Sequence, residues 1–110
     1  MTEKVIVNSA VTAADNTIQL FYTSPPTGLG TRVSAFTASN NTSSSKTYRG
    51  YIYDASAAAL GAVIPQKIIV PDKFDLGPSI VGQIIPPGGT LRMETNIANT
   101  IVFRVTGTEL

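Results

Sequence analysis

The sequence predicts an all-β protein: an antiparallel β-sandwich, jelly-roll-like or closed as a small barrel, of seven or eight strands. Three observations lead to this fold class. Short apolar segments alternate with polar residues at the period of two that a half-buried strand requires. Turn-forming residues interrupt these segments about every ten residues, as in antiparallel sandwiches and barrels. The one alanine-rich stretch, residues 55–61, is too short for a stable helix, so we interpret it as a loop or a single turn.

The clearest alternation runs from Gln83 to Gly107, which we interpret as two antiparallel strands joined by a short loop. Pro86-Pro87-Gly88-Gly89 forms a turn ahead of them, since proline fixes φ and glycine accepts left-handed angles. One face of each strand is apolar and the other is polar, which predicts that the two strands pair with each other on one core. The inward set is Leu91, Met93, Ile101, Phe103 and Val105, and the outward set includes Arg92, Glu94 and Arg104.

The N-terminal region contributes to a single domain that spans residues 1–110. Residues 1–12 contain a short β-branched run and form either the first strand or an N-terminal arm that packs against another subunit. Residues 17–23 alternate well and predict a strand. The side chains on one face of that strand are Ile18, Leu20 and Tyr22.

Residues 31–40 have the composition of a strand, but their alternation is interrupted. Val33 and Phe36 are both large and apolar, yet their positions have opposite parity. A bulge near Ser34 or Ala35 adds one residue to the strand and returns both side chains to one face. We therefore expect a bulged strand here.

Two further segments follow in the middle of the chain. Residues 40–46 contain no apolar side chain and predict an exposed loop. Residues 47–54 predict a strand with two different faces. Tyr48 and Ile52 share one face, and Tyr51 and Tyr53 share the other.

The next segment, residues 62–70, also predicts a strand, in which Pro65 marks a strand start or a sheet edge. Residues 71–78 predict a loop, and residues 79–85 predict a short strand before the proline turn. In residues 62–70, the side chains of one parity are Ile64, Ile68 and Val70.

Composition and charge limit the classes of partner. Charged residues make up 14% of the chain, a composition suited to a surface that meets other protein subunits. The eight basic residues are scattered singly, whereas nucleic-acid binding needs clustered Lys and Arg, so we expect no nucleic-acid partner. No segment has the roughly 18 apolar residues of a membrane span, and the start lacks a secretion signal. We therefore expect no membrane partner and folding in the cytoplasm.

Composition also argues against catalysis. The chain has no histidine and no cysteine, which removes Ser/His/Asp and Cys/His nucleophilic arrangements and thiolate metal sites. The remaining acids are seven carboxylates, most of them single residues beside predicted turns. We therefore expect no enzymatic activity, no cofactor, and no catalytic, cofactor-binding or metal site. The seven are Glu3, Asp15, Asp54, Asp72, Asp75, Glu94 and Glu109.

Asp72 and Asp75, with Lys73 between them, are the one close pair of carboxylates. They could supply oxygen ligands to Ca²⁺, but a calcium site takes about six to eight oxygens. We therefore expect this segment to be a solvated loop.

Three tyrosines, Tyr48, Tyr51 and Tyr53, lie close together in the sequence. Their rings could stack on sugars, or they could fill a core or a subunit interface. The absence of Trp weakens the sugar interpretation, because Trp offers the largest flat face. We favour core or interface and keep a carbohydrate-binding module as the alternative.

Several turn and strand segments give the chain a resemblance to small virion-associated proteins of tailed bacteriophages and prophages. The likeness runs from about residue 17 to residue 109. It is carried by Tyr22–Pro25, Arg32–Val33, Phe36–Thr42, Val81–Gly89 and Arg104–Glu109.

The resemblance implies a non-enzymatic structural protein of the virion that works by contact with other virion proteins. The role that we favour is a capsid decoration or cement protein, which bridges major capsid subunits as a homo-oligomer, preferably a trimer. A neck, tail or fibre-associated component is the first alternative. In either case the protein is made in the host cytoplasm and located in the virion.

Overall fold

The computed structural model describes residues 2–57 and 59–110, and the side chains of residues 3–57 and 63–110. It confirms the all-β class, with nine strands and no helix in these ranges, and hence no helix there that could cross a membrane. The strands are β1 (Thr2–Ala10), β2 (Gln19–Thr23), β3 (Thr31–Asn40), β4 (Lys46–Tyr53), β5 (Ala59–Ile69), β6 (Lys73–Asp75), β7 (Ile84–Ile85), β8 (Thr90–Thr95) and β9 (Ile101–Glu109).

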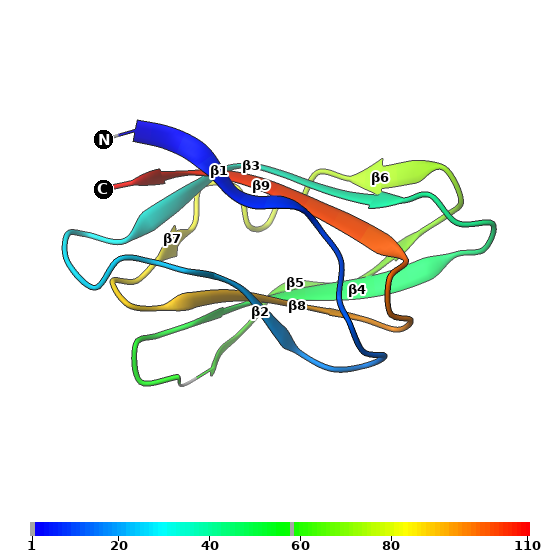
Figure 1. Ribbon diagram of the computed structural model, residues 1–110, viewed down its shortest axis with the longest axis horizontal. Coiled ribbons are helices and arrows are strands. Elements are labelled where there is room, and N and C mark those ends of the chain that lie inside the picture. The colour runs from blue at the N-terminus through cyan, green and yellow to red at the C-terminus, as the bar shows by residue number, and fades with distance from the viewer. Residues whose placement is uncertain (1, 58) are drawn as a thin grey trace.

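The strands form two antiparallel sheets that pack face to face (Figure 1). Sheet A has the order β1-β9-β3-β6, with the short β7 also paired to β3, and sheet B has the order β2-β8-β4-β5. With β7 left aside, β1 pairs with β9, β2 with β8, β3 with β6 and β4 with β5. This nested pairing of eight strands in two sheets is the jelly roll.

The core lies between the sheets and contains the predicted inward sets. The five apolar side chains expected to face inward between Leu91 and Val105 are all fully buried. In β4, Tyr48 and Ile52 are buried, and the predicted turn before β8 forms with Gly88 at φ 72° and a hydrogen bond from Gly89 N to Pro86 O of 2.8 Å. The period-two patterns therefore identified the buried faces of β4, β8 and β9.

The predicted bulge in β3 is confirmed. Val33 pairs with Gly107 and Ala35 with Thr106, so Ser34 is the extra residue. Because the bulge changes the parity, Val33 and Phe36 both lie in the core.

The predicted pairing of the last two strands is wrong. The loop 96–100 crosses the sandwich, so β8 pairs with β2 and β4 in sheet B, whereas β9 pairs with β1 and β3 in sheet A. Alternation alone does not separate the two arrangements, because strands that face each other across a core bury the same side chains as strands paired on one face.

Two further strands depart from the predicted alternation because they carry bulges. In β5, Ile68 is 68% exposed and Ile69 is 3% exposed, since an extra residue near Pro65 reverses the parity opposite β4. In β2, a bulge between Leu20 and Tyr22 leaves Leu20 exposed while Tyr22 packs against the core.

Several predicted boundaries also change. Residues 59–61, expected in a loop, belong to β5, and Ala58 lies outside the described residues. The predicted loop 71–78 contains β6, and of the predicted strand 79–85 only β7 is a strand.

The loop before β4 is more enclosed at its ends than expected. Asn40 and Lys46 are buried. Asn40 Nδ2 donates to the carbonyl oxygens of Ser44 and Ile69 at 2.9 and 2.7 Å, and this anchors the loop to the end of β5.

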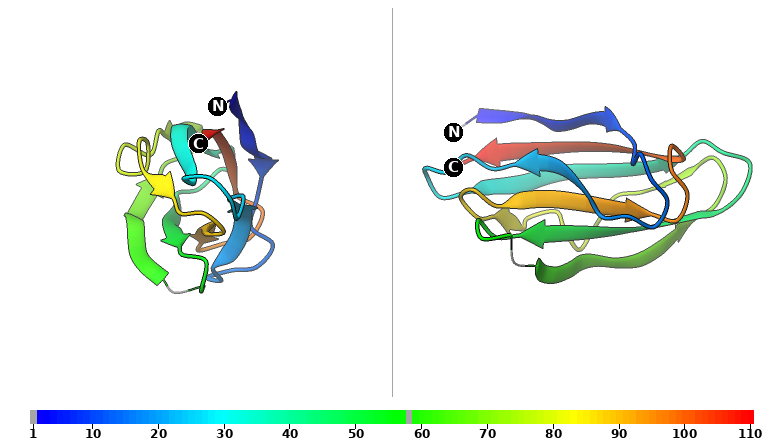
Figure 2. Two further views of the ribbon diagram at one scale, coloured as in Figure 1. Left: turned by 90° about the vertical axis from the view of Figure 1, so that its left-hand side faces the viewer. Right: turned by 60° about the horizontal axis from the view of Figure 1, so that its bottom comes forward.

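Residues 2–10 form a paired strand, with Thr2 opposite Glu109 and Val7 opposite Val105. β1 is thus the edge strand of sheet A. Both chain ends lie at the same end of the sandwich, as Figures 1 and 2 show.

Candidate functional site

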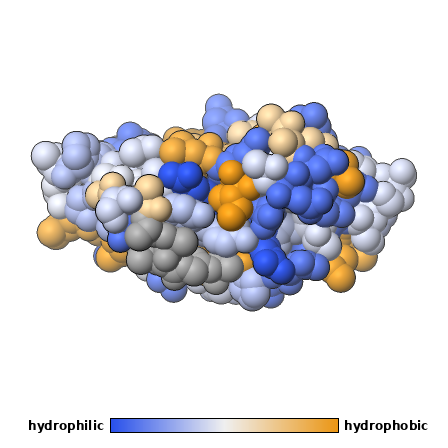
Figure 3. Space-filling model, turned by 90° about the horizontal axis from the view of Figure 1, so that it is seen from below, coloured by the Kyte–Doolittle hydropathy of each residue, from blue (hydrophilic) through white to orange (hydrophobic). Residues whose placement is uncertain are grey.

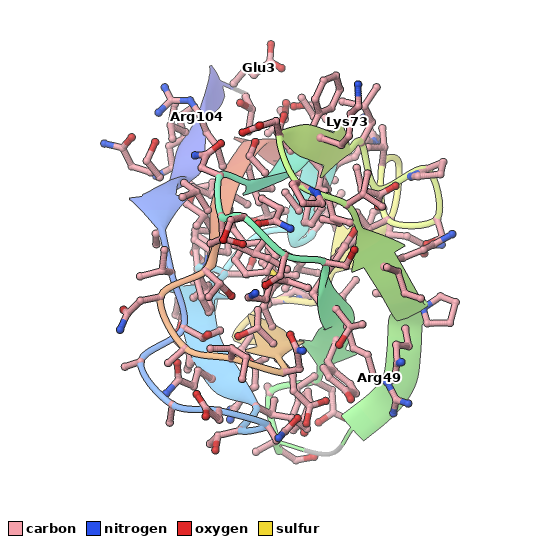
Figure 4. All side chains as sticks on the ribbon, turned by 90° about the vertical axis from the view of Figure 1, so that its right-hand side faces the viewer. Glu3, Arg49, Lys73 and Arg104 are labelled. Atoms are coloured by element: carbon pink, nitrogen blue, oxygen red, sulfur yellow. The ribbon has the colours of Figure 1, made fainter. Side chains whose placement is uncertain are left out.

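The carboxylates do not gather into a catalytic or metal-binding cluster. Asp75 accepts a hydrogen bond from the Tyr48 hydroxyl, whereas Asp72 is exposed in the turn before β6. Across the described residues, no group of three or more Asp or Glu side chains could hold a metal ion. Figure 4 shows the charged side chains of Glu3, Arg49 and Lys73 directed outward from different parts of the sandwich.

The three neighbouring tyrosines separate into a core residue and two surface residues. The Tyr48 ring lies in the core, with centroids 6.0 Å from Phe36 and 5.5 Å from Phe103. Burial, and then the hydrogen bond to Asp75, raise the pKa of the Tyr48 hydroxyl far above its ordinary value. Tyr51 and Tyr53 lie on the outer face of sheet B, where neither is fully enclosed.

That outer face contains a polar cleft at the end of the β4–β8 ladder. Its volume is about 210 Å³, and Arg49 and Glu94 occupy directly opposed positions on its two strands. Figure 3 shows this side of the molecule as mostly hydrophilic, with separate hydrophobic groups among the polar side chains. We name this polar cleft the Arg49–Glu94 cleft. It is lined by Asn16, Thr47, Tyr48, Arg49, Gln66, Glu94, Thr95 and Asn96.

Most polar groups of the cleft are held in place by neighbouring side chains. Arg49 Nη2 donates to Gln66 Oε1 at 3.2 Å, and the Tyr51 hydroxyl donates to Glu94 Oε1 at 2.9 Å. Burial, followed by the bond to Glu94, raises the pKa of the Tyr51 hydroxyl, and a hydrogen bond from Arg49 to the same hydroxyl opposes this rise. Arg49 and Glu94 do not form an ion pair with each other, since within the described residues the one ion pair is Lys4–Glu109 at 3.0 Å.

The same face continues beyond the cleft with two aromatic rings. Tyr51 and Tyr53 meet edge to face with centroids 6.4 Å apart, and the Arg92 guanidinium lies 4.4 Å from the centroid of the Tyr53 ring. Arg92 therefore covers one face of Tyr53.

The open edges of the sandwich carry most of the exposed large apolar side chains. Figure 2 shows β1 and β2 on one side of the sandwich and β5 and β6 on the other. We name the second side the β5–β7 edge, because its exposed apolar residues come from the segment of the chain that runs from the end of β5 to β7. The β5–β7 edge comprises Ile68, Val70, Phe74, Leu76, Val81 and Ile84, and the opposite side, the β1–β2 edge, comprises Val5, Val11, Ile18 and Leu20.

Sequence reasoning identified neither the cleft nor the β5–β7 edge. One signal for the edge is present: Phe74 and Leu76 are apolar residues within a segment whose composition predicts a loop. The cleft has no local signal, because Arg49, Gln66 and Glu94 come from three strands whose pairing order the sequence does not reveal.

Comparisons with known proteins add no assignment, since no protein-family model, curated protein or solved structure matches this chain.

Proposed function

We propose that this chain is a non-enzymatic structural protein of a bacteriophage particle, and specifically a capsid decoration or cement protein that bridges major capsid subunits. The observation that carries the proposal is the β5–β7 edge, where six large apolar side chains remain exposed on a small sandwich. Large apolar side chains that gather in the open on one side of a small domain favour a site of protein–protein contact there.

The backbone of this edge also favours contact with another protein. β5 is the open edge of sheet B, and the short strands β6 and β7 cover only parts of the open side of β3. Open strands present unpaired N–H and C=O groups, which native proteins guard with charges or cover with a partner. Lys67, Asp72 and Lys73 lie among these apolar residues, so charges guard this edge in part, and the exposed apolar side chains between them are left for a covering partner.

The arrangement of two apolar edges supports a homo-oligomer. Because the β1–β2 edge and the β5–β7 edge lie on opposite sides of the sandwich, a head-to-tail contact between copies would cover both, and such contacts form a ring when the rotation between copies closes. A trimer on a three-fold position of the capsid would present identical contacts to identical neighbours. Several weak contacts made by one ring add through their effective concentration.

The fold supports the proposal by analogy. Jelly rolls serve as viral capsid domains and also as lectin domains. Since one fold hosts many functions, this analogy adds weight only together with the exposed edges. A neck, tail or fibre-associated role uses the same edges, and it is distinguished from decoration by the number of copies in a particle.

A binding experiment with particles tests the proposal. Purified particles that lack this protein are mixed with the wild-type chain or with a Phe74→Ser/Leu76→Ser variant, and bound protein is measured after sedimentation. We expect the wild type to bind and the variant to bind at least tenfold more weakly. Leu29→Ser is the matched control, because Leu29 is 76% exposed in the loop before β3, outside both edges. Equal binding of all three chains would exclude the β5–β7 edge as the contact surface.

A further inference from the structure

We propose that the Arg49–Glu94 cleft binds a neutral saccharide, a function separate from assembly into a particle. The site lies on the outer face of sheet B, whereas the apolar edges lie at the sides of the sandwich. The two proposals therefore concern different surfaces and can fail independently.

The opposed charges at the cleft, with the Tyr51 hydroxyl bonded to both, support this ligand class. Arg49 and Glu94 are directly opposed on β4 and β8, yet they form no ion pair. Arg49 has guanidinium donors beyond those that meet Gln66 and the Tyr51 hydroxyl, and Glu94 has a second carboxylate oxygen beyond the one that accepts from Tyr51. The cleft thus presents a strong donor and a strong acceptor side by side on two neighbouring strands.

The balance of charge indicates which ligands fit. A phosphate or sulfate would meet the Glu94 carboxylate, and a metal cation would meet the Arg49 guanidinium, so each charged ligand faces a like charge. A hydroxyl group both donates and accepts, and adjacent hydroxyls on a sugar ring can satisfy Arg49 and Glu94 together. The amides of Asn16, Gln66 and Asn96 add donors and acceptors around the same space.

The aromatic side chains extend the site along β4. Alternate residues on one face of a strand lie roughly 6.5–7 Å apart, so the Tyr51 ring follows Arg49 at about the spacing of one sugar ring. Arg92 covers one face of Tyr53, which makes Tyr51 the better stacking surface. The volume of about 210 Å³ is below the roughly 300 Å³ at which pockets for drug-sized ligands begin, and it suits a single ring.

Two measurements on the full chain test the proposal. The labelled protein is applied to an array of neutral and acidic glycans, and ¹⁵N-labelled protein is titrated with chitotriose, maltotriose, cellotriose and mannotriose while amide shifts are recorded. We expect retention on neutral glycans and shifts confined to β4, β8 and the adjoining part of β5. Failure of all neutral glycans to bind, binding of acidic glycans alone, or shifts centred on another surface would each overturn the proposal.

Variants connect binding to the named groups. Glu94→Gln keeps the shape and removes the charge, and Arg49→Gln removes the guanidinium; each should raise the Kd for the bound saccharide at least tenfold. Arg104→Gln is the matched control, since Arg104 is exposed on sheet A, and it should leave the Kd unchanged. Thermal unfolding of each variant verifies that it is folded. Unchanged affinity in both folded cleft variants would contradict the assignment.

Discussion

The hydroxyl of Tyr48 donates a hydrogen bond to the carboxylate of Asp75, and this bond joins the two sheets of the sandwich. Tyr48 belongs to β4 in sheet B, and Asp75 belongs to β6 in sheet A. The ring packs between Phe36 and Phe103 while the hydroxyl reaches the short edge strand. One side chain thus fills the core and fixes β6 beside the β5–β7 edge.

Removing this hydroxyl should destabilise the protein. Tyr48→Phe keeps the ring but leaves Asp75 without its buried donor, which should lower the free energy of unfolding by about 1–3 kcal/mol. Tyr51→Phe is the control, because its hydroxyl bonds to Glu94 on the outer face, and it should change stability by about 0.5 kcal/mol or less. Denaturant unfolding measures both. Equal effects of the two substitutions would mean that the link between the sheets adds no stability.

Phe103 is the centre of the aromatic core. It is fully buried and contacts the rings of Phe21, Phe36 and Tyr48. Phe103→Ala should therefore lower the free energy of unfolding by about 3–5 kcal/mol. Phe74→Ala removes the same ring from a side chain that is 62% exposed, and it should cost less than about 1 kcal/mol in the isolated chain. A loss under about 1 kcal/mol at Phe103, measured by denaturant unfolding, would contradict the core described above.

Alkaline pH should destabilise the fold through its tyrosines. Burial, and secondarily the Glu109 carboxylate, raise the pKa of Tyr22 from 10.0 to about 12. Between these values the unfolded chain loses the phenolic proton while the folded chain keeps it, so the free energy of unfolding falls as pH rises. Below pH 10 the contribution of Tyr22 to the free energy of unfolding does not change with pH. The raised pKa of Tyr48 likewise lowers the free energy of unfolding as pH rises.

Denaturant unfolding across the range from about pH 9 to about 12, with tyrosinate absorbance recorded in parallel, measures this dependence. Tyr22→Phe should flatten the slope above pH 10. A stability that stays constant or rises with pH up to about 12 would contradict the raised pKa of the Tyr22 hydroxyl.

Calcium should have no effect on the protein. Asp75 accepts hydrogen bonds from the Tyr48 hydroxyl and from Gly77 N at 3.3 Å, and Asp72 lies in an exposed turn, so the pair does not form a set of oxygen ligands. Calorimetric titration should show no stoichiometric Ca²⁺ binding. Tight binding that disappears in Asp72→Ala would overturn this prediction.

The faces of individual strands could be predicted because alternation is a local property. Even the bulge at Ser34 had a local signal, since Val33 and Phe36 are large apolar residues of opposite parity. The bulge near Pro65 reversed the faces of Ile68 and Ile69 without such a signal, because three consecutive β-branched residues, Ile68 to Val70, satisfy either parity.

The sheet order and the surfaces depend on long-range pairing, which alternation does not encode. The same inward side chains are buried whether β8 and β9 pair in one sheet or face each other across the core. Asn40 is the polar last residue of β3, and its burial depends on the distant carbonyl of Ile69. The Arg49–Glu94 cleft likewise exists only once β4 and β8 are placed side by side.

The number of copies of this protein in purified phage particles tests the central proposal most directly. Quantitative mass spectrometry gives that number relative to the major capsid protein. Decoration of the head predicts on the order of hundreds of copies, arranged by the symmetry of the capsid, whereas about six to twelve copies would move the protein to the neck or tail. Absence of the protein from purified particles would contradict a structural role in the virion.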